Sequence, residues 1–156
     1  MVHTIEGQVR GEAVRVAIAV SRWNALVTER LLLGAVDTLR RYGVGEGAVT
    51  VVWCPGSFEL PLLVQELAQT GQYDAVIALG AVIRGETPHF EYIATQVAAG
   101  IARVGLQTRV PCIFGVLTTD TLEQALERAG GKVGNKGVEA ALAALEMVNL
   151  LRQLRQ

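Results

Sequence analysis

Histidine is the side chain best suited to move protons near neutral pH, and this sequence contains two of them. His89 lies in a glycine- and proline-containing stretch, residues 80–91, that precedes a long predicted helix, whereas His3 lies close to the N-terminus. His89 is therefore the candidate general acid or base. The alternative is a histidine at a helix start that makes a structural hydrogen bond.

Four loops, each directly after an apolar run, carry the other groups that suit ligand binding. They are residues 21–24, 54–61, 80–91 and 115–120. Together they hold aromatic rings, hydroxyls, glycines and ionisable groups. Residues 85–87 precede a predicted helix N-terminus, where free backbone N–H groups suit a phosphate or carboxylate, although an ordinary capped turn has the same pattern.

A glycine-rich stretch, residues 130–137, contains both lysines of the chain, Lys132 and Lys136, and follows Arg128. These cations are candidates for anion binding, although cations at helix ends are also common on plain surfaces. The spacing is not that of a P-loop, and no strand leads into the stretch. Cys54 lacks an evident base and is read as a packing residue, and no His, Cys and Asp cluster has metal-ligand spacing.

Strands and helices alternate along the chain and must position these loops. Apolar runs predict strands at 14–20, 49–53, 75–81 and 112–117, and periodicity predicts helices at 24–42, 60–70, 90–107, 121–129 and 136–151. Asn24 is expected to cap the first helix, and Asp120 or Thr121 to begin a capping box. The pattern predicts an α/β three-layer sandwich with a four-stranded parallel sheet. Its ligands should bind beyond the carboxyl ends of the strands.

The composition favours an oligomer in the cytoplasm. Hydrophobic residues make up 51% of the chain, and the net charge is −1. That balance gives no reason to expect a nucleic-acid partner, and the longest apolar run is far shorter than the ~20 residues that span a membrane. The predicted helix at 90–107 carries no charge between Tyr92 and Ala102, so we expect it to pack on a neighbouring subunit. Residues 1–11 form an N-terminal arm, which we expect to add as a strand to a neighbouring subunit's sheet.

Four ordered motifs resemble those of one family, the 6,7-dimethyl-8-ribityllumazine synthases of riboflavin biosynthesis. They are Pro55–Pro61, Gly80–Phe90, Phe114–Thr119 and Gly134–Gly137, and the resemblance runs from about Val14 to the C-terminus. It implies a flavodoxin-like fold in a single domain over residues 1–156. It also implies a condensation of 5-amino-6-(D-ribitylamino)uracil with 3,4-dihydroxy-2-butanone 4-phosphate, without cofactor or metal.

The resemblance assigns roles residue by residue. It implies that His89 transfers protons, that Glu139 orients the His89 side chain and that Lys136 takes part in catalysis. It implies substrate binding by Trp23, Asn24, Ser57, Phe58, Glu59, Ala81, Val82, Ile83 and Phe114, with Trp23 stacked on the pyrimidine. It implies phosphate binding by Glu86, Thr87 and Arg128. The family more often has Phe at the position of Trp23 and a small residue at that of Glu86.

The resemblance also implies shared active sites, into which Phe114 and Arg128 enter from the neighbouring subunit. The short Gly134–Gly137 turn resembles that of members whose pentamers form icosahedral shells, which can enclose a riboflavin synthase. Two other functions stay open. One is an archaeal-type riboflavin synthase, against which the Gly134–Gly137 motif argues. The other is a flavin- or lumazine-binding carrier or cage, against which the presence of His89 and Arg128 argues.

Overall fold

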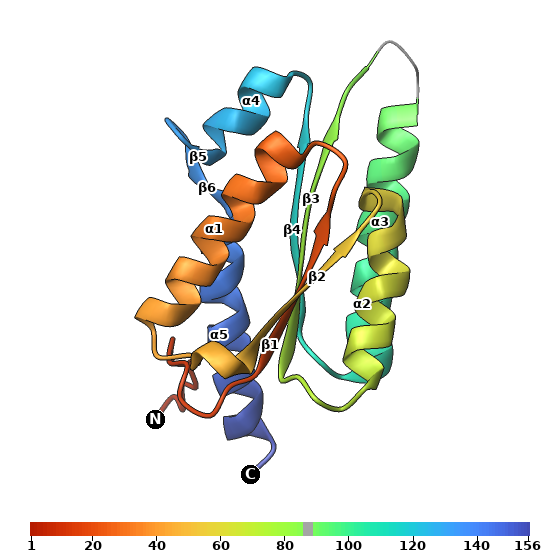
Figure 1. Cartoon of the computed structure of the whole chain (residues 1–156). Coiled ribbons are helices and arrows are strands. Elements are labelled where there is room, and N and C mark those ends of the chain that lie inside the picture. Colours follow the sequence, from red (N-terminus) through yellow and green to blue (C-terminus); the bar gives the residue numbers. More distant parts are fainter. Residues whose placement is uncertain (86–88) are drawn as a thin grey trace.

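A computed structural model describes residues 1–85 and 89–156 of the chain, and within them a parallel sheet lies between two layers of helices (Figure 1). The four strands of the sheet are β1 (Val16–Ser21), β2 (Val49–Cys54), β3 (Ala75–Ile83) and β4 (Cys112–Thr119). They run in the order β2-β1-β3-β4, and every neighbouring pair is parallel. The predicted fold class is confirmed.

Helices cover both faces of the sheet. The helices are α1 (Ala25–Arg41), α2 (Leu60–Gln69), α3 (His89–Thr108), α4 (Leu122–Glu127) and α5 (Lys136–Leu154), with short 3-10 turns η1 (Glu46–Ala48) and η2 (Ser57–Glu59). Figure 1 shows α1, α4 and α5 on one face and α2 and α3 on the other. A two-stranded hairpin, β5 (Ala129–Gly131) and β6 (Gly134–Asn135), joins α4 to α5 and was not predicted.

The alternation of side chains along β1 divides the core between the two faces. Val16, Ile18 and Val20 pack in the core on the side of α1 and α5, while Ala17 and Ala19 pack in the core on the side of α2 and α3. Ser21 continues the second series and is fully buried. The side chain of Ser21 therefore points toward the α2 and α3 layer.

The N-terminal arm forms no strand within the chain but lies along α5. The Asn149 side-chain amide donates to the carbonyls of Gln8 at 2.8 Å and Arg10 at 2.9 Å, and the Gln153 amide donates to that of Glu6 at 2.8 Å. No local pattern in the sequence predicts that the arm binds to α5, because the donors lie about 140 residues away. Strands β2 and β4 are the edge strands of the sheet, and addition of the arm to the sheet of a neighbouring subunit remains a prediction.

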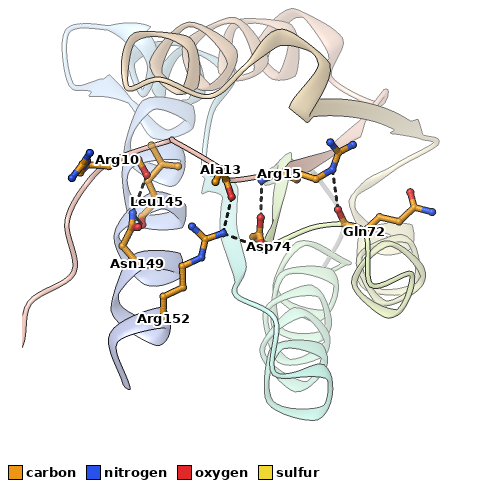
Figure 2. Close-up of polar contacts among 8 residues, drawn as sticks. All are labelled: Arg10, Ala13, Arg15, Gln72, Asp74, Leu145, Asn149 and Arg152. Carbon is orange, nitrogen blue, oxygen red and sulfur yellow. Dashed lines mark hydrogen bonds and ion pairs between the residues drawn. The ribbon is translucent and has the colours of Figure 1, made fainter. Parts of the chain in front are cut away.

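Polar contacts hold the amino ends of β1 and β3 in place, at the end of the sheet opposite the loops that follow the strands (Figure 2). The Asp74 carboxylate accepts from the backbone N–H of Arg15 at 2.8 Å and pairs with Arg152 at 3.4 Å. Arg152 also donates to the carbonyl of Ala13 at 2.7 Å, and Arg15 donates to that of Gln72 at 3.3 Å. These contacts tie the starts of β1 and β3 to α5, at the end of the sheet opposite the carboxyl ends of the strands.

Candidate active site

A cavity of about 440 Å³ opens at the carboxyl ends of β1, β2 and β3, and we call it the first pocket. Nine of the residues that the sequence predicted line it: Trp23, Asn24, Ser57, Phe58, Glu59, Ala81, Val82, Ile83 and His89. Parallel strands bring loops that are distant in sequence to a single edge, so the predicted convergence is confirmed for this group. Glu86 and Thr87 lie outside the described residues.

Two exposed aromatic side chains stand at this pocket. Trp23 is 73% exposed and Phe58 is 57% exposed, although both are large apolar groups. The backbone N–H of Trp23 donates to the Pro55 carbonyl at 2.9 Å, so the loops after β1 and β2 are tied together. An aromatic ring of a ligand would remove apolar surface of both side chains from water.

The polar part of the pocket centres on the carbonyl oxygen of Ala81. The Asn24 amide donates to it at 3.1 Å, and the Ser57 hydroxyl donates to it at 3.5 Å. Asn24 has a left-handed backbone, with φ of 66°, and its side chain makes no capping hydrogen bond to α1. The prediction that Asn24 caps this helix was therefore wrong, because the side chain reaches across the sheet edge to β3 instead.

His89 is the first residue of α3 and is exposed beside the first pocket. Ile93 lies one turn further along the same helix and lines the same pocket, as spacing of four residues requires. Just after β3, Arg84 pairs with Asp120 at 3.5 Å, and its guanidinium carbon lies 6.0 Å from the centre of the Phe90 ring. His89 thus combines access to solvent with a defined place at the pocket.

A second pocket of about 460 Å³ is lined by residues of β4, the β5–β6 hairpin and the start of α5. The four remaining predicted residues that the structure describes, Phe114, Arg128, Lys136 and Glu139, all line it. Two cations, one carboxylate and an aromatic ring therefore share one cavity. A phosphate group is a suitable ligand for the paired cations.

Local hydrogen bonds fix the backbone that carries these side chains. Thr121 and Gln124 form the predicted capping box at the start of α4. The carbonyl of Arg128 accepts from the backbone N–H of Lys136 at 2.8 Å across the hairpin. The Asn135 side chain then caps α5 by accepting from the N–H groups of Gly137 and Val138. The hairpin thus brings Arg128 back beside Lys136.

A family model for 6,7-dimethyl-8-ribityllumazine synthase matches residues 13–152 of the chain. The chain belongs to this family. The match covers all four strands of the sheet, both pockets and nearly the whole of α5. Membership in the lumazine synthase family makes the chain an enzyme of riboflavin biosynthesis with a transferase-type reaction.

The predicted site residues fall into two groups that do not share a pocket. His89 lines the first pocket, whereas Glu139 lines the second, and no hydrogen bond joins them within the described part of the chain. The expected orientation of His89 by Glu139 is therefore not made inside one chain. Lys136 and Glu139 share the second pocket with Phe114 and Arg128, the two residues for which the resemblance implies entry from a neighbouring subunit.

The sequence did not predict some of the residues that line the pockets. They include Val116, Leu117, Thr118 and Val133 in the second pocket. Both strands β3 and β4 extend two residues beyond their predicted ends, so the sheet itself forms part of each pocket. The hairpin could have been suspected from Gly130 and Gly134, which both adopt positive φ.

Neither cysteine has a thiol that is activated as a nucleophile. Burial raises the pKa of the Cys54 thiol, and the carboxylate of Glu59 raises it further, whereas Arg22 and the hydrogen bond to Gly56 lower it. Burial raises the pKa of Cys112 to about 11. Both thiols are therefore protonated near neutral pH, which agrees with the reading of Cys54 as a packing residue.

Residues 1–85 and 89–156 contain no group of three or more His, Cys, Asp and Glu side chains arranged to hold a metal ion. Across the same ranges, no helix has the length and apolar character needed to cross a membrane.

Proposed function

We propose that this chain condenses 5-amino-6-(D-ribitylamino)uracil with 3,4-dihydroxy-2-butanone 4-phosphate to 6,7-dimethyl-8-ribityllumazine. One phosphate and two waters leave for each product formed. The observation that carries the proposal is the gathering of all described candidate residues into two pockets of complementary chemistry. One pocket suits a flat ring with a hydroxylated chain, and the other suits a phosphate.

The first pocket would hold the pyrimidine substrate. Trp23 stacks on the ring, and backbone groups of Ala81–Ile83 meet its polar edge. Ser57 and Glu59 bind the hydroxyls of the ribityl chain, with Asn24 and Phe58 beside them. The exposed ring of Trp23 and the hydroxyl of Ser57 above the Ala81 carbonyl support this orientation.

The second substrate would bind through its phosphate. Arg128 is exposed and supplies a charge-assisted contact, with Lys136 beside it. Phe114 would cover the ring from the side opposite Trp23. The backbone N–H groups near Glu86 and Thr87, which lie outside the described residues, would complete the phosphate site.

The proposed reaction moves protons at each step. The amine of the uracil attacks the ketone carbon, and loss of water gives an imine. Elimination then releases phosphate, and closure of the second ring releases another water. His89 would accept and return the protons, and alignment of the two substrates supplies much of the remaining acceleration.

A complete site requires two copies of the chain in this proposal. The first pocket lacks a cation that suits the phosphate among its described lining residues, and the second lacks a histidine. Docking the second pocket of one copy on the first pocket of another would bring Glu139 to His89. It would also cover Phe58 and Val133, which are 57% and 58% exposed in the single chain.

The direct test mixes the purified protein with both substrates and follows the lumazine spectrum, with the uncatalysed reaction subtracted. Turnover above that background supports the proposed function. An intact oligomer without turnover would favour a lumazine- or flavin-binding carrier or cage instead.

Co-expression of two damaged chains tests the shared site. His89→Ala damages the first pocket, and Arg128→Ala damages the second. Because one half of each site comes from each of two copies, about one quarter of the sites in a random 1:1 assembly should be intact. Because Arg128 is assigned to phosphate binding, the rate is measured at a phosphate-substrate concentration well below the wild-type KM. Co-expressed chains should then regain about a quarter of the wild-type kcat/KM for that substrate, whereas the same variants purified apart and mixed should not. If the co-expressed assembly matched only the average of its two parents, the shared site would be wrong.

We also propose that pentamers of this enzyme assemble into an icosahedral shell, which can enclose a riboflavin synthase in the cytoplasm. The absence of an insertion at Gly134–Gly137 supports this assembly, because the turn from the hairpin to α5 is short. Light scattering should give a mass of many pentamers. A mass corresponding to free pentamers at all concentrations would contradict the shell.

A further inference from the structure

Ser21, at the last position of β1, has a buried hydroxyl that the proposed chemistry does not use. It is 0% exposed, and its oxygen has no hydrogen-bond partner in the part of the chain that the structure describes. A buried hydroxyl without a partner opposes folding, because its hydrogen bonds to water are lost and not replaced. An alanine would fit the pattern of Ala17 and Ala19 on the same face.

The hydroxyl oxygens of Ser21 and Ser57 both lie close to Gly80 of β3. A β-carbon built on Gly80 would lie 3.2 Å from the Ser21 oxygen and 2.7 Å from the Ser57 oxygen. The two hydroxyls therefore border the same small space, which exists because residue 80 has no side chain. Ser57 also lines the first pocket, so it connects this space to the ligand.

Ser57 is weakly held in the structure. Its hydroxyl donates to the Ala81 carbonyl at 3.5 Å, which is a long contact, and that carbonyl already accepts from Asn24 at 3.1 Å. The single proton of Ser57 can therefore turn toward a ligand at little cost. Turning the hydroxyl also turns the two lone pairs of the Ser57 oxygen, and one of them can then face a second donor.

We propose that Ser21 is a positioning residue, whose hydroxyl donates to Ser57 when the first pocket is occupied and so directs the Ser57 proton to the polyhydroxyl chain of the substrate. Binding would then supply the partner that Ser21 lacks in the empty pocket. This inference rests on the proposed function, because Ser57 is assigned there to the ribityl chain. It adds a residue that does not touch the substrate.

Ser21→Ala tests the inference. The KM for the ribitylamino substrate should rise about fivefold, the value expected for one hydrogen bond. The KM for the phosphate substrate and kcat should both stay within about twofold, since Ser57 is assigned to the ribityl chain and not to the phosphate or the reacting atoms. The melting temperature should stay equal or rise, because a buried hydroxyl without a partner has been removed. A purely structural role would instead lower the melting temperature or move both KM values.

Thr28→Val provides a matched control. Thr28 is also 0% exposed, and its hydroxyl also has no partner among the described residues, but it lies on α1 and lines neither pocket. The melting temperature of Thr28→Val should also stay equal or rise, and both KM values should stay unchanged. Ser57→Ala with and without Ser21→Ala completes a double-mutant cycle, in which Ser21→Ala should have no further effect once Ser57 is gone.

The outcomes separate the two proposals. Wild-type protein without turnover overturns both the proposed function and the role of Ser21. Wild-type turnover with an unchanged KM for Ser21→Ala, or with an effect that persists fully in the Ser57→Ala background, overturns the role of Ser21 alone.

Discussion

Replacing His89 with alanine is expected to lower kcat by about 100-fold, because each step of the proposed reaction needs a proton to be moved at the right place. The KM values should change by less than about threefold, since the aromatic, hydroxyl and cationic groups of both pockets remain. The structure favours this residue because His89 starts α3 at the first pocket and is exposed there. Steady-state kinetics with each substrate varied in turn measure both effects.

His3→Ala is the control for this prediction. His3 is the other histidine of the chain and lies exposed in the N-terminal arm, away from both pockets. The kcat of the His3→Ala variant should match that of the wild type. If His89→Ala kept kcat within threefold of the wild type, proton transfer would have to be assigned to another group, and Lys136 would be the next candidate.

Gly137→Ala is expected to destabilise the fold by about 3 kcal/mol or more, because the added carbon has no space. A β-carbon built at this position would overlap the backbone carbonyl oxygen of Leu31 and lie 2.8 Å from its carbonyl carbon. Backbone atoms of α1 cannot move aside as a flexible side chain can. The start of α5, which carries Lys136 and Glu139, would have to shift away from α1.

Thermal unfolding at fixed protein concentration measures this effect, and a loss of about 3 kcal/mol corresponds to a melting temperature lower by roughly 6–12 °C. Gly47→Ala is the matched control, because a β-carbon built there meets nothing within 4 Å. Its melting temperature should be equal to or slightly above that of the wild type. Equal melting temperatures for both variants would mean that α1 and α5 are not packed as closely as the structure describes.

Much of the fold could be predicted from the sequence, because local patterns carry most of it. The run from Ala75 to Ile83 is apolar throughout, as expected for a central strand covered on both faces, and β3 is such a strand. The capping box at Thr121 depends on two side chains three residues apart and was found. Asn24 shows the limit of such rules, because its side chain bonds to Ala81, 57 positions away.

The sequence by itself determined the layers, the parallel strands and the edge of the sheet where the chemistry lies. Hydrophobic periodicity and the types of the loop residues are local properties of the sequence. The carboxyl ends of parallel strands lie at the same end of the sheet, whatever the order of the strands. The tertiary structure alone decided which residues share a pocket. The order β2-β1-β3-β4 makes β4 an edge strand, and the β5–β6 hairpin brings Arg128 back beside Lys136. Strand order and hairpin placement depend on packing between distant segments, and this packing separates Glu139 from His89 within one chain.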